Sequence, residues 1–328
     1  MKSAFVMSTT TLSTVLITSL KLIQTDIFRI GGPILIFFGT SSCLFSYIIF
    51  RQKNLRKNPC TIYFLSFNLS NLLLIYSSLL PVMLEIGYNI KPNSYSLIQC
   101  RFRLYALTLF DCLSSLYLIL ASIDRMCVTS PNAFVRSRSN NYFAYKSIII
   151  GTLFCMIFSS HALIFQEIVP STANNIVCNF KPGIYMIFLA YYSLIKGILM
   201  PFLMILFGLL AMKNIRRLRR IHVSTEGRSH SYGPSTKDRK LILLVLMNII
   251  VYVLFDSMMT IYLMYGQITQ YYIKNDLQKQ MDTLWGSIAT FGLYSRFCIC
   301  GYINLFVSRI VCQQIKKIFL WGRIFFKI

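Results

Sequence analysis

The chain has 328 residues, of which 55% are hydrophobic and only 13% are charged, and its mean hydropathy is +0.60. Soluble domains carry roughly 25% charged residues, so this composition excludes an ordinary water-soluble protein. The formal net charge of +23 would fit nucleic-acid binding, but the basic residues lie between apolar stretches rather than on one domain face. We therefore expect a protein of the lipid bilayer that binds no nucleic acid.

Seven apolar stretches follow one another along the chain, each bounded by charged or turn-forming residues. About 20 apolar residues of helix cross a bilayer, and backbone groups in hydrocarbon must be bonded within their own segment. We therefore predict an all-α membrane protein, a seven-transmembrane helix bundle. In chain order the predicted spans are residues 28–50, 61–86, 97–127, 147–168, 184–212, 241–265 and 284–307.

Two terminal segments flank the predicted membrane domain of residues 28–307. Residues 1–27 are rich in Ser and Thr, which predicts a short tail, with a weak signal sequence as the alternative. In residues 308–328, apolar side chains recur at helical spacing with Lys316 and Lys317 opposite, which predicts an amphipathic helix on the membrane surface. Cys312 in this segment is a candidate for lipidation, and an unmodified thiol is the alternative.

The distribution of basic residues predicts the orientation of the bundle. Most of the 33 lysines and arginines lie in every second connection and after the seventh span. Lysine and arginine accumulate on the cytoplasmic side of membrane proteins. We therefore expect a multi-pass protein of the plasma membrane with its N-terminus extracellular and its C-terminus cytoplasmic.

The third span carries a distinctive residue at each end. With the predicted orientation, Cys100 and Cys178 are the pair of cysteines that face the oxidising exterior, so we expect a disulfide between them, with two unpaired thiols as the alternative. Asp124 and Arg125 lie at the opposite end of the span. The 25 residues from Cys100 to Arg125 would reach about 37 Å as a helix, which is enough to cross a hydrocarbon core of about 30 Å.

Together these features resemble the rhodopsin-like (class A) G-protein-coupled receptors, over about residues 28–320. The resemblance is carried by the two outer cysteines, by Asp124-Arg125-Met126 as an Asp-Arg-Tyr-type motif, and by Pro201 in the fifth span. Within that class, three second-span stretches look like those of invertebrate orphan and FMRFamide-type peptide receptors. They are Asn58-Pro59-Cys60, Tyr63-Phe64-Leu65-Ser66 and Ser70-Asn71-Leu72-Leu73.

The resemblance implies a receptor rather than an enzyme, one that transduces an extracellular ligand, here a neuropeptide, to a heterotrimeric G protein. In this family, outward movement of the sixth span frees the arginine that Arg125 matches, so Asp124 and Arg125 are expected to form the coupling switch. An interfacial ion pair without a switch role is the alternative. For the whole chain the alternatives are a membrane transporter, for which two related halves would be expected, or a non-signalling, degenerate seven-helix protein.

Several family motifs are missing from the chain. The second span has Asn71 where most members have an aspartate, the sixth lacks Cys-Trp-x-Pro, and the seventh lacks Asn-Pro-x-x-Tyr. Ser114 fits another position of the family's sodium site, but without a carboxylate at position 71 we expect no bound metal, and no cofactor. The seventh span also contains no lysine, which excludes a retinal Schiff base.

Three further ionisable residues, Asp111, Asp256 and Arg296, lie deep within predicted spans. Ionisable residues in a membrane span are rare and usually functional. Because opposite charges in a low dielectric attract strongly, we expect Arg296 to pair with Asp256 or Asp111. A wet cavity is the alternative environment for Asp111.

The outer halves of the spans suggest the class of ligand. Leu107 stands eighteen residues before Arg125, where aminergic receptors carry the aspartate that binds the amine, so an amine ligand is disfavoured, although Asp111 keeps that option open. Aromatic and polar residues there would suit a peptide, but tyrosine is also an ordinary membrane-interface residue. The candidate ligand contacts, in addition to Leu107, are Glu85, Tyr105, Tyr191, Tyr192, Lys196, Tyr262 and Gln267.

Overall fold

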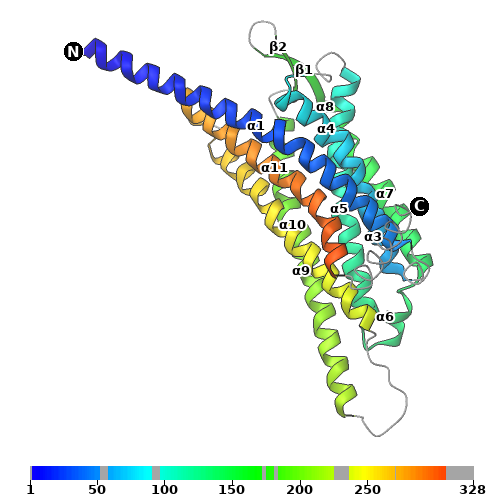
Figure 1. Cartoon of the computed structure of the whole chain (residues 1–328). Coiled ribbons are helices and arrows are strands. Elements are labelled where there is room, and N and C mark those ends of the chain that lie inside the picture. Colours follow the sequence, from blue (N-terminus) through cyan, green and yellow to red (C-terminus); the bar gives the residue numbers. More distant parts are fainter. Residues whose placement is uncertain are drawn as a thin grey trace, which may run out of the picture.

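A computed structural model describes residues 2–51, 58–90, 97–171, 175–180, 184–224, 236–269 and 271–307. It is a bundle of long helices with a β-hairpin at one end (Figure 1). The elements in chain order are α1 (Lys2–Phe50), α3 (Pro59–Leu74), η1 (Ile75–Leu79), α4 (Leu80–Val82), η2 (Met83–Gly87), α5 (Leu97–Val128), α6 (Ala133–Ser137), α7 (Asn141–Ser159), α8 (His161–Phe165), β1 (Gln166–Ser171), β2 (Asn175–Phe180), α9 (Ile184–Ser224), α10 (Thr236–Ile268) and α11 (Asp276–Val307).

Asparagine side chains begin several of the helices. Asn58 accepts a hydrogen bond from the backbone N–H of Cys60 at the start of α3, and Pro59 follows at the first helical position. Asn132 and Asn140 cap α6 and α7 in the same way. An asparagine oxygen satisfies one of the unpaired N–H groups of a first turn, and proline suits that turn because it has no N–H to satisfy.

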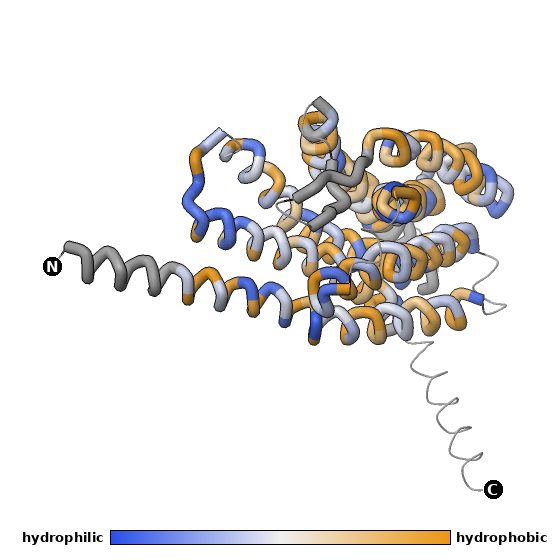
Figure 2. Tube along the Cα trace, turned by 90° about the horizontal axis from the view of Figure 1, so that it is seen from above, coloured by the Kyte–Doolittle hydropathy of each residue, from blue (hydrophilic) through white to orange (hydrophobic). Residues whose placement is uncertain are grey.

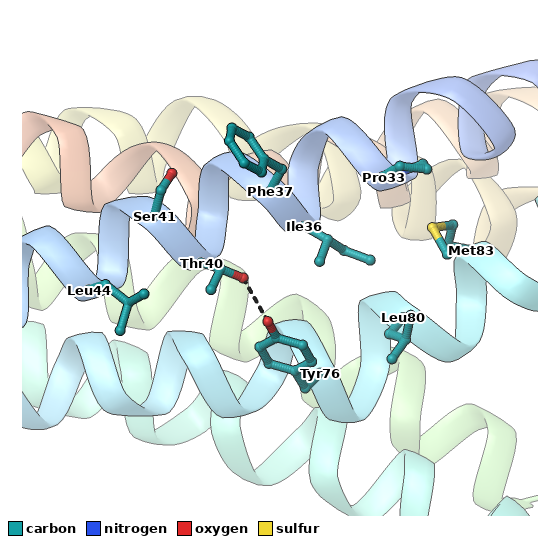
Figure 3. A pocket seen from close by; sticks show the side chains of 9 residues that line it. All are labelled: Pro33, Ile36, Phe37, Thr40, Ser41, Leu44, Tyr76, Leu80 and Met83. Atoms are coloured by element: carbon teal, nitrogen blue, oxygen red, sulfur yellow. Dashed lines mark hydrogen bonds between the residues drawn. The ribbon is translucent and has the colours of Figure 1, made fainter. Parts of the chain in front are cut away.

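The second long helix is not α-helical throughout. After α3 it passes through two five-residue π-helical segments, η1 and η2, on either side of the short α4. Pro81 lies within α4 and lacks the N–H that would continue the regular ladder, which accounts for the local rearrangement. A groove of about 540 Å³ runs beside these segments against α1. In it the Thr40 and Tyr76 hydroxyls face each other at 3.0 Å (Figure 3).

A β-hairpin occupies the region predicted to form the end of the fourth span and the following loop. The fourth span was predicted to run to residue 168, but the helix ends at Phe165 and β1 begins at Gln166, so that boundary is wrong. Strands β1 and β2 are antiparallel and Ile168 pairs with Cys178. The hairpin packs near α5, at the end of the bundle away from α6 (Figure 1).

Six stretches of the described chain are long and apolar enough to cross a membrane: Thr14–Phe50, Pro59–Gly87, Leu97–Val128, Asn141–Phe165, Ile187–Arg217 and Lys240–Ile268. They contain or overlap the first six predicted spans. The seventh predicted span lies in α11, which is helical and packs along α1 and α10. Buried polar residues such as Arg296 and Asn304 lower its hydropathy, and its crossing of the membrane stays a prediction.

The two terminal segments differ in what the structure describes. Residues 1–27 were expected to form a tail, but α1 begins at Lys2 and continues without a break to Phe50. The first helix is therefore much longer than the predicted span, and Figure 1 shows it extending past its neighbours. The predicted amphipathic helix of residues 308–328, with Cys312, lies outside the described residues.

Two buried hydrophobic clusters hold the bundle together. One lies around α3, α5 and α10 and includes Phe64, Leu118 and Tyr252, and the other joins α1, η1 and α11 through Phe28 and Ile75 among others. Many large apolar side chains are exposed on the helices as well, among them Phe37, Ile157 and Phe202, and hydrophobic residues recur along the helices in Figure 2. A surface that is apolar on both its buried and its outward faces suits a bundle surrounded by lipid.

The contact between α1 and α11 yields a stability prediction. A Cβ atom at Gly301 would lie 2.6 Å from the backbone carbonyl carbon and oxygen of Ser42, so Gly301→Ala should force the helices apart and lower the free energy of unfolding by about 1–3 kcal/mol. At Gly266 a Cβ meets nothing within 4 Å, so Gly266→Ala should be neutral or stabilise by up to about 1 kcal/mol. Thermal unfolding of the purified variants measures both, and equal melting temperatures would contradict the close packing.

Candidate functional site

Four charged side chains from four helices meet inside the bundle: Asp111 on α5, Lys196 on α9, Asp256 on α10 and Arg296 on α11. Arg296 Nη2 donates to Asp111 Oδ1 at 2.6 Å, and Arg296 Nη1 donates to Asp256 Oδ1 at 3.1 Å. Lys196 Nζ donates to the other oxygen of Asp111. We call these four residues the core charge cluster. Two carboxylates face two cations, so the cluster as a whole is neutral.

Aromatic rings enclose the arginine of the core charge cluster. The guanidinium carbon of Arg296 lies 4.3 Å from the ring centroid of Tyr252 and 4.2 Å from that of Phe297. The Tyr252 hydroxyl is in turn 3.0 Å from Ser115 Oγ on α5. Arginine is the cation best suited to such a place, because its planar group stacks on rings while its N–H groups stay bonded to carboxylates.

Burial makes this cluster energetically decisive. Arg296 is 1% exposed and Asp256 is 5% exposed, so their charges are removed from water. Such pairs contribute little net stability, but removing one partner leaves an uncompensated buried charge that is strongly destabilising. The cluster therefore constrains four helices to one mutual arrangement.

The Asp124-Arg125 pair lies near the C-terminal end of α5 and is also buried. Arg125 donates to Asp124 Oδ2 from Nε at 3.1 Å and from Nη2 at 2.5 Å, and from Nη2 to Asn58 Oδ1 at 2.8 Å. Ser139 Oγ donates to Asp124 Oδ1 at 2.5 Å. The capping residue of α3 and the segment before α7 thus hold the arginine and its carboxylate in place.

Polar side chains lie buried between the two charged sites. Ser114 Oγ donates to Asn71 Oδ1 at 2.8 Å, which joins two of the predicted intramembrane polar residues. Asn248 donates to Asn304 at 3.2 Å, and Asn304 donates to Ser46 at 3.3 Å, so that α10, α11 and α1 are linked. Buried polar bonds therefore join α5 to α3 and α10 to α11 and α1.

At the end of the bundle away from Asp124 and Arg125, charged side chains pair with one another. Arg103 Nη1 donates to Glu85 Oε2 at 2.5 Å, which ties α5 to η2. In the connection between α10 and α11, Lys274 donates to Asp282 Oδ2 at 2.5 Å, and this bond raises the pKa of Lys274. Tyr265 donates to the other oxygen of Asp282 at 3.0 Å.

The predicted ligand contacts do not all share one surface. Tyr105 and Leu107 pack against different hydrophobic clusters. Tyr191 is 59% exposed, whereas the Tyr192 ring lies 5.2 Å from that of Phe158. Tyr262 packs beside Gly286 of α11, and Gln267 is half-buried near the end of α10. Of this set, Lys196 belongs to the core charge cluster and Glu85 pairs with Arg103.

Cys100 is fully buried and disulfide-bonded. Cys178 lies in β2, opposite Ile168 of the strand that packs near α5. Its side chain is outside the described part of the structure, so the pairing of Cys100 with Cys178 stays a prediction.

Some partners at these sites were not anticipated from the sequence. Arg296 contacts both aspartates rather than one, and Lys196, expected as a ligand contact, is the second cation of the core charge cluster. Asn58 and Ser139 were not assigned to Asp124 and Arg125. A lysine deep in an apolar stretch is itself an indication of a buried partner, but asparagine and serine in connections carry no comparable indication.

Neutrality of the core charge cluster predicts which substitutions the protein tolerates. Arg296→Met leaves two carboxylates facing one cation, so it should cost about 3–5 kcal/mol of stability. Asp111→Asn combined with Lys196→Met keeps one pair, Arg296 with Asp256, and should cost less than Lys196→Met alone. Cell-surface expression and melting temperature measure this order, with the exposed Arg138→Met as control. A double variant less stable than Lys196→Met would contradict the prediction.

Comparison with known protein families identifies the fold. The family model of the 7 transmembrane receptor (rhodopsin family) matches residues 42–299. No curated protein matches the chain. The family match runs from the first long helix into α11 and spans the core charge cluster and the Asp124-Arg125 pair. It confirms the resemblance to the rhodopsin-like receptors, whereas the finer likeness to invertebrate peptide receptors stays a prediction. The chain therefore belongs to the rhodopsin family of seven transmembrane receptors.

Proposed function

We propose that the protein is a plasma-membrane receptor that couples an extracellular neuropeptide to a heterotrimeric G protein. The observation that carries this proposal is the buried arginine at the inner end of α5. Arg125 is 1% exposed and is held by Asp124 and Asn58. A buried, internally bonded arginine beside a helix end is a group that can be released to a partner when the helices move.

The contacts around Arg125 support such a switch. Asn58 belongs to the start of α3, and Asn214 of α9 donates to the carbonyl oxygen of Met126 at 3.4 Å. Movement of either neighbouring helix would therefore alter bonds at this end of α5. In the proposed active state, Arg125 exchanges Asp124 and Asn58 for the G protein.

The charge distribution favours a peptide over a small amine. A protonated amine needs an available carboxylate, but Asp111 is bonded to both Lys196 and Arg296, and Glu85 is bonded to Arg103. Leu107 offers no charge. A peptide with apolar and amidated groups can bind at the outer end through aromatic and polar contacts without displacing these ion pairs.

The outer end of the proposed receptor is the one that carries Cys100 and the hairpin. We propose that Cys178 of β2 is the partner of Cys100, which would tether the hairpin to α5 above the ligand site. This assignment agrees with an extracellular N-terminus and a cytoplasmic Asp124-Arg125 end. Oxidising conditions outside the cell favour such a bond.

The role of Arg125 can be tested without a ligand. Asp124→Asn keeps the side-chain size but removes the charge that holds Arg125, so ligand-independent G-protein activation should rise about tenfold. Arg125→Ala should reduce activation to the background of cells that lack the receptor. Energy-transfer sensors of G-protein dissociation, normalised to surface expression, measure both. Arg138→Gln, which changes an exposed arginine, serves as control and should signal like the wild type. An Arg125→Ala variant that still activates the G protein would contradict the proposal.

The ligand class can be tested by a screen. Cells that express the receptor should respond in calcium or cAMP to an amidated peptide and not to biogenic amines. Cells with the Arg125→Ala variant at matched surface level should stay silent. Activation by amines alone would refute the peptide assignment while leaving G-protein coupling intact.

A further inference from the structure

Two cysteine thiols touch each other inside the bundle. The Sγ atoms of Cys112 on α5 and Cys155 on α7 are 3.3 Å apart, although the two residues lie 43 positions apart in the chain. Both are free thiols, and they are only 6% and 1% exposed. Neither residue belongs to the core charge cluster or to the contacts of Arg125 described above. We call these two residues the thiol pair.

The contacts beside the thiol pair hold α5 and α7 in a fixed antiparallel register. The Tyr117 hydroxyl on α5 lies 2.7 Å from Thr152 Oγ1 on α7. A Cβ atom at Gly151 of α7 would lie 2.6 Å from Leu116 Cδ2 of α5. Residue numbers rise along one helix as they fall along the other from contact to contact. The thiol pair is therefore part of a continuous line of contacts between the two helices.

Gly151 favours a close approach of the two backbones at this point. Small residues let helices in membranes come near each other, and Leu116 fills the space that the missing side chain leaves. Gly151 lies four residues before Cys155, so the two share one face of α7. A disulfide needs Cα atoms about 4.4–6.8 Å apart, which is closer than most helices pack. The glycine thus supplies the kind of contact that a disulfide between two helices requires.

The position of the thiol pair determines which reagents reach it. Cys112 lies 12 residues after Cys100 on α5, or about 18 Å along a helix, which is near the middle of a hydrocarbon core of about 30 Å. Phe154 and Met156, on either side of Cys155, are exposed on the outer face of α7. Hydrogen peroxide is a small neutral molecule that crosses membranes, so it can enter at this depth, whereas charged reductants of the cell stay in water.

A two-electron oxidation can join the thiol pair. One sulfur attacks an oxygen of hydrogen peroxide, the O–O bond breaks, and the departing hydroxide takes the thiol proton as water, which leaves a sulfenic acid. The second sulfur displaces the hydroxyl group of the sulfenic acid, which leaves as water with the second thiol proton. Two thiols and one peroxide thus give one disulfide and two waters. The S–S bond of about 2.05 Å requires the two sulfurs, now 3.3 Å apart, to move about 1.3 Å closer.

We propose that Cys112 and Cys155 form an oxidation site, at which a hydroperoxide converts the thiol pair into a reversible disulfide between α5 and α7. The bond holds α5, the helix that carries Asp111 and Arg125, against its neighbour in the middle of the membrane. The proposal goes beyond coupling to a G protein, and its test in purified protein does not depend on signalling.

The first test maps the disulfide in the full-length wild-type receptor, purified, placed in phospholipid vesicles and treated with hydrogen peroxide. The remaining thiols are blocked, and chymotrypsin, which cleaves after aromatic residues such as Phe154 and Phe158, separates Cys155 from Cys178. Mass spectrometry without reductant should find the peptides of Cys112 and Cys155 joined, and dithiothreitol should release them.

The control within the same sample is Cys127, a partly exposed free thiol near the end of α5. Its peptide should be recovered unjoined. Recovery of Cys112 and Cys155 as two blocked thiols overturns the proposal, because the pair would then be packing residues only. Disulfides that join either residue to another cysteine overturn it as well.

Melting temperature supplies the second test. The disulfide closes a loop of 43 residues, so peroxide should raise the melting temperature of the wild type by about 5 °C. Cys127→Ser should gain as much, whereas Cys155→Ser, which lacks one partner, should gain nothing. An equal gain in Cys155→Ser overturns the proposal, because the stabilising bond would lie elsewhere. The peptide mapping uses only the wild-type chain, so its result stands whether or not Cys155→Ser folds.

Discussion

The arrangement of the bundle depends on one constraint, the neutrality of the core charge cluster. Asp111, Lys196, Asp256 and Arg296 come from four helices and are all largely withdrawn from water. In a low-dielectric interior, each charge is tolerable only while an opposite charge stays bonded to it. The helices α5, α9, α10 and α11 therefore cannot slide or rotate independently. Aromatic stacking of Tyr252 and Phe297 on Arg296 fixes the guanidinium further.

The same helix, α5, connects this constraint to both ends of the molecule. Its N-terminal part carries the disulfide-bonded Cys100 and the Arg103–Glu85 pair, and its C-terminal end carries Asp124 and Arg125. The family motifs missing from the sixth and seventh spans would normally occupy the region near the cluster. Here the ion pair between Asp256 and Arg296 joins α10 to α11.

How well a structural feature could be predicted from the sequence depends on the physical cause of that feature. The first six spans were predictable because hydrocarbon requires about 20 apolar residues. Asp111 and Arg296 were expected to find partners because unpaired charges are costly there. The β-hairpin was missed because its first residues, 166–168, fall within the predicted fourth span, and the pairing of β1 with β2 leaves no mark in the run of apolar residues. The helical start of α1 was missed because Ser and Thr in that segment favour a tail by composition.

The sequence by itself determined that the protein lies in a lipid bilayer, that it consists of successive apolar helices, and that it resembles one receptor family. It also determined which distinctive residues lie at the two ends of α5. Only the tertiary structure decided which polar groups meet. Lys196 and Asp111 lie 85 residues apart, and Arg296 and Asp111 lie 185 apart. Helices that are apolar on their lipid-facing and buried sides alike show little periodicity, so their rotation cannot be deduced from the sequence. That rotation, set by packing against neighbouring helices, brings two carboxylates and two cations together and places Arg125 against Asn58.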